Sequence, residues 1–157
     1  IVSADEFWYP LDSLHDWNRM YGRRGFTQYQ CVLPRSAKGG ARRLLESLTK
    51  SGATIFLCVF KDFGKESEGT LSFPMPGVTL AIDIPVRDDT QRLVDQTNEL
   101  VLREGGRIYL AKDAFTRGEH YRAMDPRVPR FEAVRDTWDP NRRWKSALGT
   151  RIFGDAP

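Results

Sequence analysis

The chain has 157 residues, a length typical of one domain, and its 40% hydrophobic and 29% charged residues are typical of a soluble globular protein. Its apolar runs all fall short of the roughly 20 residues that a membrane-spanning helix needs. The 24 basic and 21 acidic residues are interspersed along the sequence. A net charge of +3 with this distribution argues against a nucleic-acid-binding protein.

The N-terminus begins with Ile1 and leads directly into an aromatic segment that lacks the features of a signal peptide. We therefore expect a piece of a longer protein, folded as a single domain over residues 1–157. Within this domain we expect a core at about 26–113 and a helical tail at 114–157.

Helices are expected at both ends of the chain. A short helix that ends at Met20 is expected after an N-cap at Asp12 or Ser13. In the tail, helices are expected at 116–125 and 127–138. Large aromatic side chains of the tail are expected to dock it on the rest of the molecule: Trp138, Trp144 and Phe153.

The first predicted strand of the core is Thr27–Leu33. Side-chain alternation places Gln28 and Gln30 on one of its faces and apolar side chains on the other. A helix is predicted from Ser36, with apolar residues at helical spacing, and Gly52 closes it.

The middle of the core is predicted to hold two strands joined by a long loop. Residues 53–61 are continuously apolar, which favours a buried central or near-central strand. Residues 62–77 are rich in glycine and proline and predict an irregular loop. In the strand 78–86, alternation places Thr79 and Asp83 opposite the apolar side chains.

A second helix is predicted from Thr90, and the strand Arg107–Ala111 follows it. Two strand-helix-strand units in series predict an α+β fold of the ferredoxin-like split β-α-β type, with an antiparallel sheet and helices on one face. The uncovered face should then carry the polar side chains Gln28, Gln30, Thr79, Asp83 and Tyr109.

The two cysteines, Cys31 and Cys58, lie within predicted strands and match no zinc or redox spacing. We expect buried, reduced thiols. The usual strand order of this fold separates the two strands, which argues against a disulfide.

Few residues point to chemistry without further context. The sequence has no phosphate-binding glycine loop, no nucleophile elbow and no metal-ligand cluster, so we expect no metal site. Lys61 ends a predicted strand, and Lys112 directly follows another. Because lysines are mostly exposed, the ordinary interpretation of both is a surface lysine. Gln28 and Gln30 need hydrogen-bond partners if they are covered, whereas water would satisfy them on an open face.

A series of segments, in order and over nearly the whole chain, carries a resemblance to a known family: Tyr9–Asp12, Trp17–Gly22, Gly25–Pro34, Val59–Gly64, Leu71–Pro74, Ile108–Asp113 and Ala123–Arg127. These segments resemble the C-terminal half of FAD-linked oxidases of the vanillyl-alcohol-oxidase-like flavoprotein family. In such proteins an N-terminal domain binds FAD, and the C-terminal domain caps the flavin and binds substrate.

The resemblance implies that this chain is the cap, and that the FAD-binding domain, absent from it, is its partner in the same protein. It implies hydride transfer from a hydroxyl of a sugar, sugar-lipid or sugar-lactone to FAD, and an inactive isolated chain. Lys112 is implied to lie beside the flavin as the catalytic residue, with Tyr109 as a second cofactor contact. The substrate-binding residues are expected to be Gln28, Gln30, Lys61, Phe63, Thr79, Asp83 and Tyr109.

The sequence departs from the family at two sheet positions: Ala81 stands where the family has a cysteine, and Thr79 where it has an asparagine. The resemblance therefore does not fix the substrate, which could be a related sugar, sugar-lactone or polyol. The alternative is a free-standing ferredoxin-like module that binds a small regulatory ligand. An RNA-binding module would need paired aromatics on the open face of the central strands, where amides stand instead. We expect a cytoplasmic location, with peripheral membrane contact left open.

Overall fold

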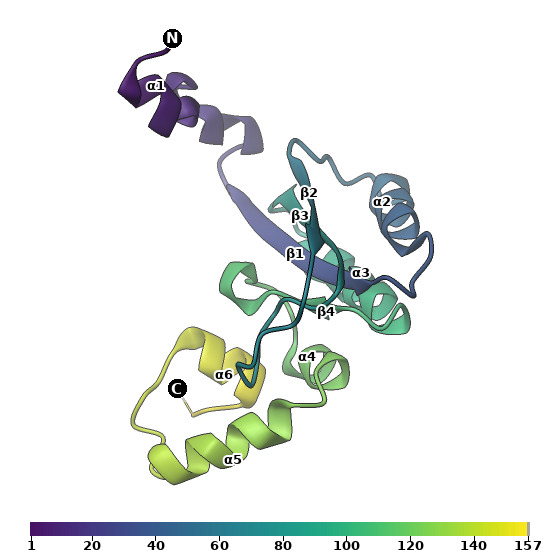
Figure 1. Cartoon of the computed structure of the whole chain (residues 1–157), viewed down its shortest axis with the longest axis vertical. Helices are drawn as coiled ribbons and strands as arrows, with labels where there is room; N and C mark the ends of the chain where they lie inside the picture. Colours follow the sequence, from purple (N-terminus) through teal and green to yellow (C-terminus); the bar gives the residue numbers. More distant parts are fainter. Residues whose placement is uncertain (157) are drawn as a thin grey trace.

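A four-stranded antiparallel sheet forms the centre of the molecule, with helices against it (Figure 1). This computed structural model describes residues 1–156, without the side chain of Leu11. The strand order is β2-β3-β1-β4, which is that of the split β-α-β sandwich, so the predicted α+β class is confirmed. The strands are β1 (Phe26–Pro34), β2 (Cys58–Phe63), β3 (Gly77–Pro85) and β4 (Arg107–Ile108).

Two helices, α2 (Gly40–Lys50) and α3 (Thr90–Arg103), cover one face of this sheet (Figure 1). Their apolar stripes meet every second residue of the strands in one buried core. Leu44 of α2, Val101 of α3 and Cys31 of β1 have no solvent-exposed surface. The predicted arrangement, with both long helices on the same face, is confirmed.

Helix α2 begins later than predicted, at Gly40 rather than Ser36. The residues after β1 form a turn in which Ala37 donates its backbone N–H to the Pro34 carbonyl. Gly39 then adopts a left-handed φ of 73°. Because only glycine takes this conformation without strain, the helix cannot start before it.

The strand predicted to be central and buried is the edge strand β2, so this prediction was wrong. It begins only at Cys58 and pairs with β3 alone. Cys31 is buried as expected, but Cys58 is exposed, so the expectation of a buried thiol was wrong for Cys58. Phe60 of the same strand is exposed as well. A continuous apolar run does not distinguish a central strand from an edge strand. Strand β3 separates β1 from β2, which agrees with the expected absence of a disulfide.

The N-terminal segment contains three short helices in place of the single one predicted: α1 (Ala4–Trp8), η1 (Pro10–Ser13) and η2 (Trp17–Tyr21). A capping box at Ser3 starts α1 earlier than expected. Asp16 has a positive φ of 54°, which interrupts any continuous helix before η2. The segment extends away from the sheet beyond the start of β1 (Figure 1).

Strand β4 is shorter than predicted and is followed by a 3-10 turn, η3 (Leu110–Lys112). Tyr109 donates its backbone N–H to the Gln30 carbonyl at 2.8 Å, so the chain stays beside β1 for one more residue. Lys112 therefore lies on a turn past the sheet edge and not directly at a strand end.

The tail is helical, as predicted, with α4 (Gly118–Met124), α5 (Val128–Trp138) and α6 (Ala147–Phe153). Phe153 packs against the core, as expected. The centroids of the Phe153 and Phe131 rings lie 5.2 Å apart. Trp138 and Trp144 are 76% and 75% exposed, so the expectation that they dock the tail was wrong. Within the described residues, no helix combines the length and the hydrophobicity needed to cross a bilayer.

Candidate functional site

Polar side chains occupy the sheet face that α2 and α3 leave uncovered. Gln28 of β1 lies opposite Asp83 of β3, and Lys61 of β2 lies opposite Thr79. Directly opposed residues of antiparallel strands share a face, which confirms the side-chain parity predicted from the sequence. Gln28 is half-buried, and Asp83 and Thr79 are buried, so this face is partly covered by other segments of the chain.

The carboxylate of Asp83 accepts hydrogen bonds on both of its oxygens. Gln28 Nε2 donates to Oδ1 at 2.7 Å, and the Tyr21 hydroxyl donates to Oδ2 at 2.9 Å. Because a carboxylate only accepts, it fixes the NH2 end of Gln28 toward itself. The amide oxygen of Gln28 accepts no hydrogen bond from residues 1–156 and remains available to a ligand.

Burial and the hydrogen bond to Asp83 raise the pKa of Tyr21 to about 12. The phenol therefore keeps its proton, and its role as donor, throughout the neutral range. Tyr21 thereby ties the N-terminal segment to the sheet through a buried contact.

A second polar pair lies beside the first. The Thr79 hydroxyl donates to the Cys31 carbonyl at 2.8 Å and accepts from Gln30 Nε2 at 3.1 Å. The two glutamines of β1 thus have the same orientation, each with its NH2 group bound to a β3 side chain. Their carbonyl oxygens are the ends left for a ligand.

Aromatic rings cover the other end of the face. Tyr109 stacks on Phe73 at 4.7 Å between centroids, and Phe73 meets Phe63 edge-on at 5.7 Å. Lys61 lies on the edge strand near this cluster and is exposed. Two expected site residues, Phe63 and Tyr109, are therefore linked through a third aromatic ring that the sequence reasoning did not single out.

Two arginines hold the long loop over this face. Arg107 and Arg127 both donate to the Ser72 carbonyl, at 2.9 and 2.8 Å, and both donate to Glu66 at 2.7 Å. Asp125 accepts from Arg127 in turn. Burial opposes the charged form of Asp125, but the hydrogen bonds from Arg127 outweigh it and lower the pKa of that carboxyl.

A cavity of about 570 Å³ lies between the N-terminal segment and the open face. It brings together three of the expected site residues, Gln28, Asp83 and Lys112. Lys112 is half-buried, and no carboxylate of residues 1–156 lies within ion-pair distance of its ammonium. The rest of the lining is largely aromatic and aliphatic, which is the usual composition of a small-molecule site.

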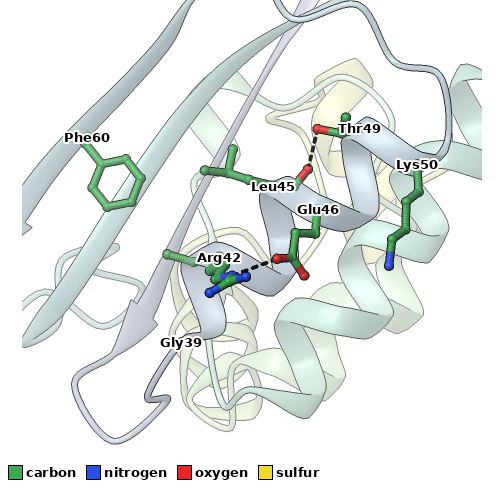
Figure 2. Close-up of a pocket in the computed structure, with 8 residues that line it drawn as sticks. Gly39, Arg42, Leu45, Glu46, Thr49, Lys50 and Phe60 are labelled. Carbon is green, nitrogen blue, oxygen red and sulfur yellow. Dashed lines mark hydrogen bonds and ion pairs between the residues drawn. The ribbon is translucent and has the colours of Figure 1, made fainter.

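A larger cavity, of about 650 Å³, lies on the opposite side, between α2 and Phe60 of the edge strand (Figure 2). Figure 2 shows that Arg42 is paired with Glu46, at 2.7 Å, and that Thr49 donates to the Leu45 carbonyl. Arg42, Glu46 and Thr49 are thus already paired within the helix. Across residues 1–156, no three metal-ligating side chains lie close enough to hold a metal ion.

The sequence reasoning missed the cavity wall formed by the N-terminal segment. Trp17 lies within the predicted short helix and Tyr21 directly follows it, and neither was predicted to line a site. Phe26 could have been found, because it shares strand parity with Gln28. Its ring stacks on Tyr21 with centroids 4.3 Å apart.

No protein-family model matches the chain. An uncharacterized protein in the mprA 5′ region of Streptomyces coelicolor is 32% identical over 139 residues, which are 87% of this chain and 38% of that protein. Decaprenylphosphoryl-beta-D-ribose oxidase of Mycolicibacterium smegmatis is 37% identical over 152 residues, 97% of this chain and 33% of that protein.

The chain therefore spans about a third of the length of the curated relatives that it matches. The resemblance carried by the sequence segments is confirmed: over nearly its whole length, the chain is similar to one part of a decaprenylphosphoryl-ribose oxidase.

Proposed function

We propose that this chain is the substrate-binding cap of a longer FAD-dependent oxidoreductase, and that it acts as one domain. Its partner is then an FAD-binding domain of the same protein, which precedes it. The reaction is oxidation of a hydroxyl of a sugar, sugar-lipid or sugar-lactone. The observation that best supports the proposal is the unpaired ammonium of Lys112, which shares a cavity with the amide of Gln28.

The residues present fit a flavin at this face. FAD, when bound, supplies the acceptor for the hydride that leaves the alcohol carbon, and negative charge develops there. Lys112 holds a positive charge in a partly enclosed site that it shares with Asp83, and no carboxylate of residues 1–156 lies within ion-pair distance of its ammonium. Such a preorganised cation stabilises developing negative charge far better than water does. Tyr109, whose carbonyl accepts the backbone N–H of Lys112, is a second proposed cofactor contact.

The substrate contacts proposed for this chain follow from its free hydrogen-bonding atoms. The carbonyl oxygens of Gln28 and Gln30 accept from sugar hydroxyls, and the bonds to Asp83 and Thr79 keep both amides in that orientation. Lys61 and Phe63 border the aromatic end of the face. Asp83 and Thr79 act through the glutamines, because their own polar atoms are already engaged.

The test uses the longer protein with its flavin under anaerobic conditions. We expect a short-chain prenylphosphoryl-β-D-ribose, or a related sugar, lactone or polyol, to bleach the oxidised flavin band. We also expect this chain alone to purify without flavin and to be inactive. Two results would favour the alternative, a regulatory module that binds a small ligand. One is that no sugar or polyol reduces the flavin, and the other is that the longer protein binds no flavin.

The cellular location follows from the proposed function. A substrate attached to a lipid would bring the protein to a membrane surface as a peripheral protein of the cytoplasmic side. The proposal needs no membrane-spanning helix within this chain.

A further inference from the structure

The carboxylate of Asp113 directly follows Lys112 in the chain, yet it forms no ion pair with the Lys112 ammonium. Consecutive Cα atoms are about 3.8 Å apart, so a carboxylate next to a lysine is within reach of its ammonium. The Asp113 side chain is only 5% exposed, and its hydrogen bonds go to other partners. The arrangement of this carboxylate therefore decides whether Lys112 keeps an uncompensated charge.

Asp113 accepts hydrogen bonds from the loop that follows it and from helix α6. Its Oδ1 atom accepts the backbone N–H of Thr116 at 2.9 Å and that of Phe115 at 3.3 Å. Its Oδ2 atom accepts from the guanidinium of Arg151 on α6 at 2.6 Å. A buried carboxylate is costly without a cationic partner, and Arg151 supplies that partner through a charge-assisted hydrogen bond.

Arg151 also binds the backbone of the same loop. Its guanidinium donates to the carbonyl of Asp113 at 3.2 Å and to the carbonyl of Thr116. One planar guanidinium thus holds a carboxylate and two carbonyls, which suits its several N–H donors in a fixed geometry. Arg151 therefore both compensates the charge of Asp113 and fixes the direction in which that carboxylate points.

Helix α3 holds the loop through a second set of bonds. The fully buried Asn98 donates to the Thr116 hydroxyl at 3.0 Å and accepts from the Tyr29 hydroxyl at 2.8 Å. Gln91 donates to the Phe115 carbonyl at 2.9 Å. The loop is thus bound by α3 and by α6, and it continues directly from the turn η3. Such contacts preorganise the side chains that the turn presents.

We propose that Arg151 is a positioning residue of the reaction, and that it acts by holding the Asp113 carboxylate away from the Lys112 ammonium. This inference rests on the proposed function for the role of Lys112. Without Arg151 the buried carboxylate loses its cationic partner, and the adjacent ammonium, which has no ion pair of its own, can replace it. A paired Lys112 would no longer stabilise negative charge that develops in the proposed site.

The first test uses this chain without flavin and measures acetylation of Lys112 by N-acetoxysuccinimide with mass spectrometry. The variants are Arg151→Gln and the double variant Arg151→Gln/Asp113→Asn, and Arg143→Gln, at an exposed position, is the control. A carboxylate beside an amine favours the charged form, which does not react with this reagent. We expect acetylation at least about threefold slower in Arg151→Gln, and wild-type acetylation in the double variant and in the control.

Faster or unchanged acetylation in Arg151→Gln would overturn the proposal, because the carboxylate would then not have moved to Lys112. Slow acetylation that Asp113→Asn does not reverse would overturn it as well. If Arg151→Gln alone does not fold, the double variant decides, because removal of both partners leaves no uncompensated buried charge. Wild-type acetylation in the double variant then supports the proposal, and slow acetylation contradicts it.

The second test follows flavin reduction in the longer protein by anaerobic stopped flow. Arg151→Gln should lower the limiting rate at least about tenfold and change the half-saturating substrate concentration less than about threefold. Adding Asp113→Asn should restore most of this rate, whereas two losses of a merely structural kind would add. A double variant as slow as Arg151→Gln would contradict the proposal. Slow acetylation in Arg151→Gln, together with wild-type flavin reduction in Lys112→Ala, would count against the proposed function alone.

Discussion

Tyr21 donates its hydroxyl to the buried carboxylate of Asp83 at 2.9 Å, across 62 positions of sequence. The same carboxylate orients the amide of Gln28. One acidic side chain therefore connects the segment that walls the cavity with the strand that supplies a ligand acceptor. In the proposed site Asp83 acts as a positioning residue, because each of its oxygens already accepts a hydrogen bond from another side chain.

Replacing Tyr21 with phenylalanine should detach the N-terminal segment from the sheet. The substitution leaves the Asp83 carboxylate buried with one partner fewer, and we expect it to lower the free energy of unfolding by about 1–3 kcal/mol. Urea denaturation measures this change. Tyr9→Phe is the control, because Tyr9 is 61% exposed and should tolerate the same substitution. Equal effects of the two substitutions would contradict the anchoring role.

The contribution of Tyr21 to the free energy of unfolding should decrease at alkaline pH. Its pKa is raised from 10.0 to about 12 in the folded chain, so the unfolded chain loses this proton first as the pH rises. The contribution is therefore complete below pH 10 and is lost as the pH rises toward 12. Unfolding measured across this range should show a smaller alkaline loss in Tyr21→Phe than in the wild type. Parallel curves for the two proteins would argue against the shift.

The hydroxyl of Thr79, more than the volume of its side chain, should determine its contribution to the free energy of unfolding. Thr79→Val preserves the volume but leaves a Gln30 amide hydrogen and the Cys31 carbonyl without their partner in a buried site. We expect a loss of about 1–3 kcal/mol in the free energy of unfolding. Thr79→Ser keeps the hydroxyl and should cost less. If the serine variant were the less stable of the two, packing and not hydrogen bonding would dominate at this position.

Arg127→Ala should release the loop 64–76 from the open face. Arg127 immediately precedes α5, and the substitution removes its side-chain bonds to Ser72, Glu66 and Asp125. We expect amide hydrogen exchange around Phe73 to become at least about tenfold faster, which corresponds to about 1.4 kcal/mol of local stability. Val134→Ala, at an exposed position of α5, is the control. Unchanged exchange in Arg127→Ala would show that Arg107 suffices.

The fold could be predicted where side-chain periodicity is strong. The alternation in Thr27–Leu33 and the helical spacing before Gly52 gave the correct strand, helix and uncovered face. The edge position of β2 could not be predicted, because pairing partners distant in sequence decide whether an apolar run is central. The exposure of Trp138 and Trp144 was missed for a similar reason: large aromatic side chains are usually buried, and nothing local indicates an exception.

The candidate site could be predicted only in part. Strand parity brought Gln28 and Asp83 together, and the family resemblance added Lys112, which local sequence alone assigns to the surface. The wall formed by Leu14, Trp17 and Met20 depends on the long-range bond between Tyr21 and Asp83, for which no sequence pattern exists.

The central claim, that this face is the reactive side of a flavoenzyme, is tested most directly by Lys112→Ala in the longer protein, followed by anaerobic stopped-flow bleaching of the flavin. Loss of one preorganised charge should slow flavin reduction about 10²–10³-fold. The melting temperature should stay nearly unchanged, because the Lys112 side chain is half-buried and lies on a turn. Lys50→Ala, at the cavity on the opposite side, should reduce flavin at the wild-type rate. Wild-type reduction rates in Lys112→Ala would contradict the claim.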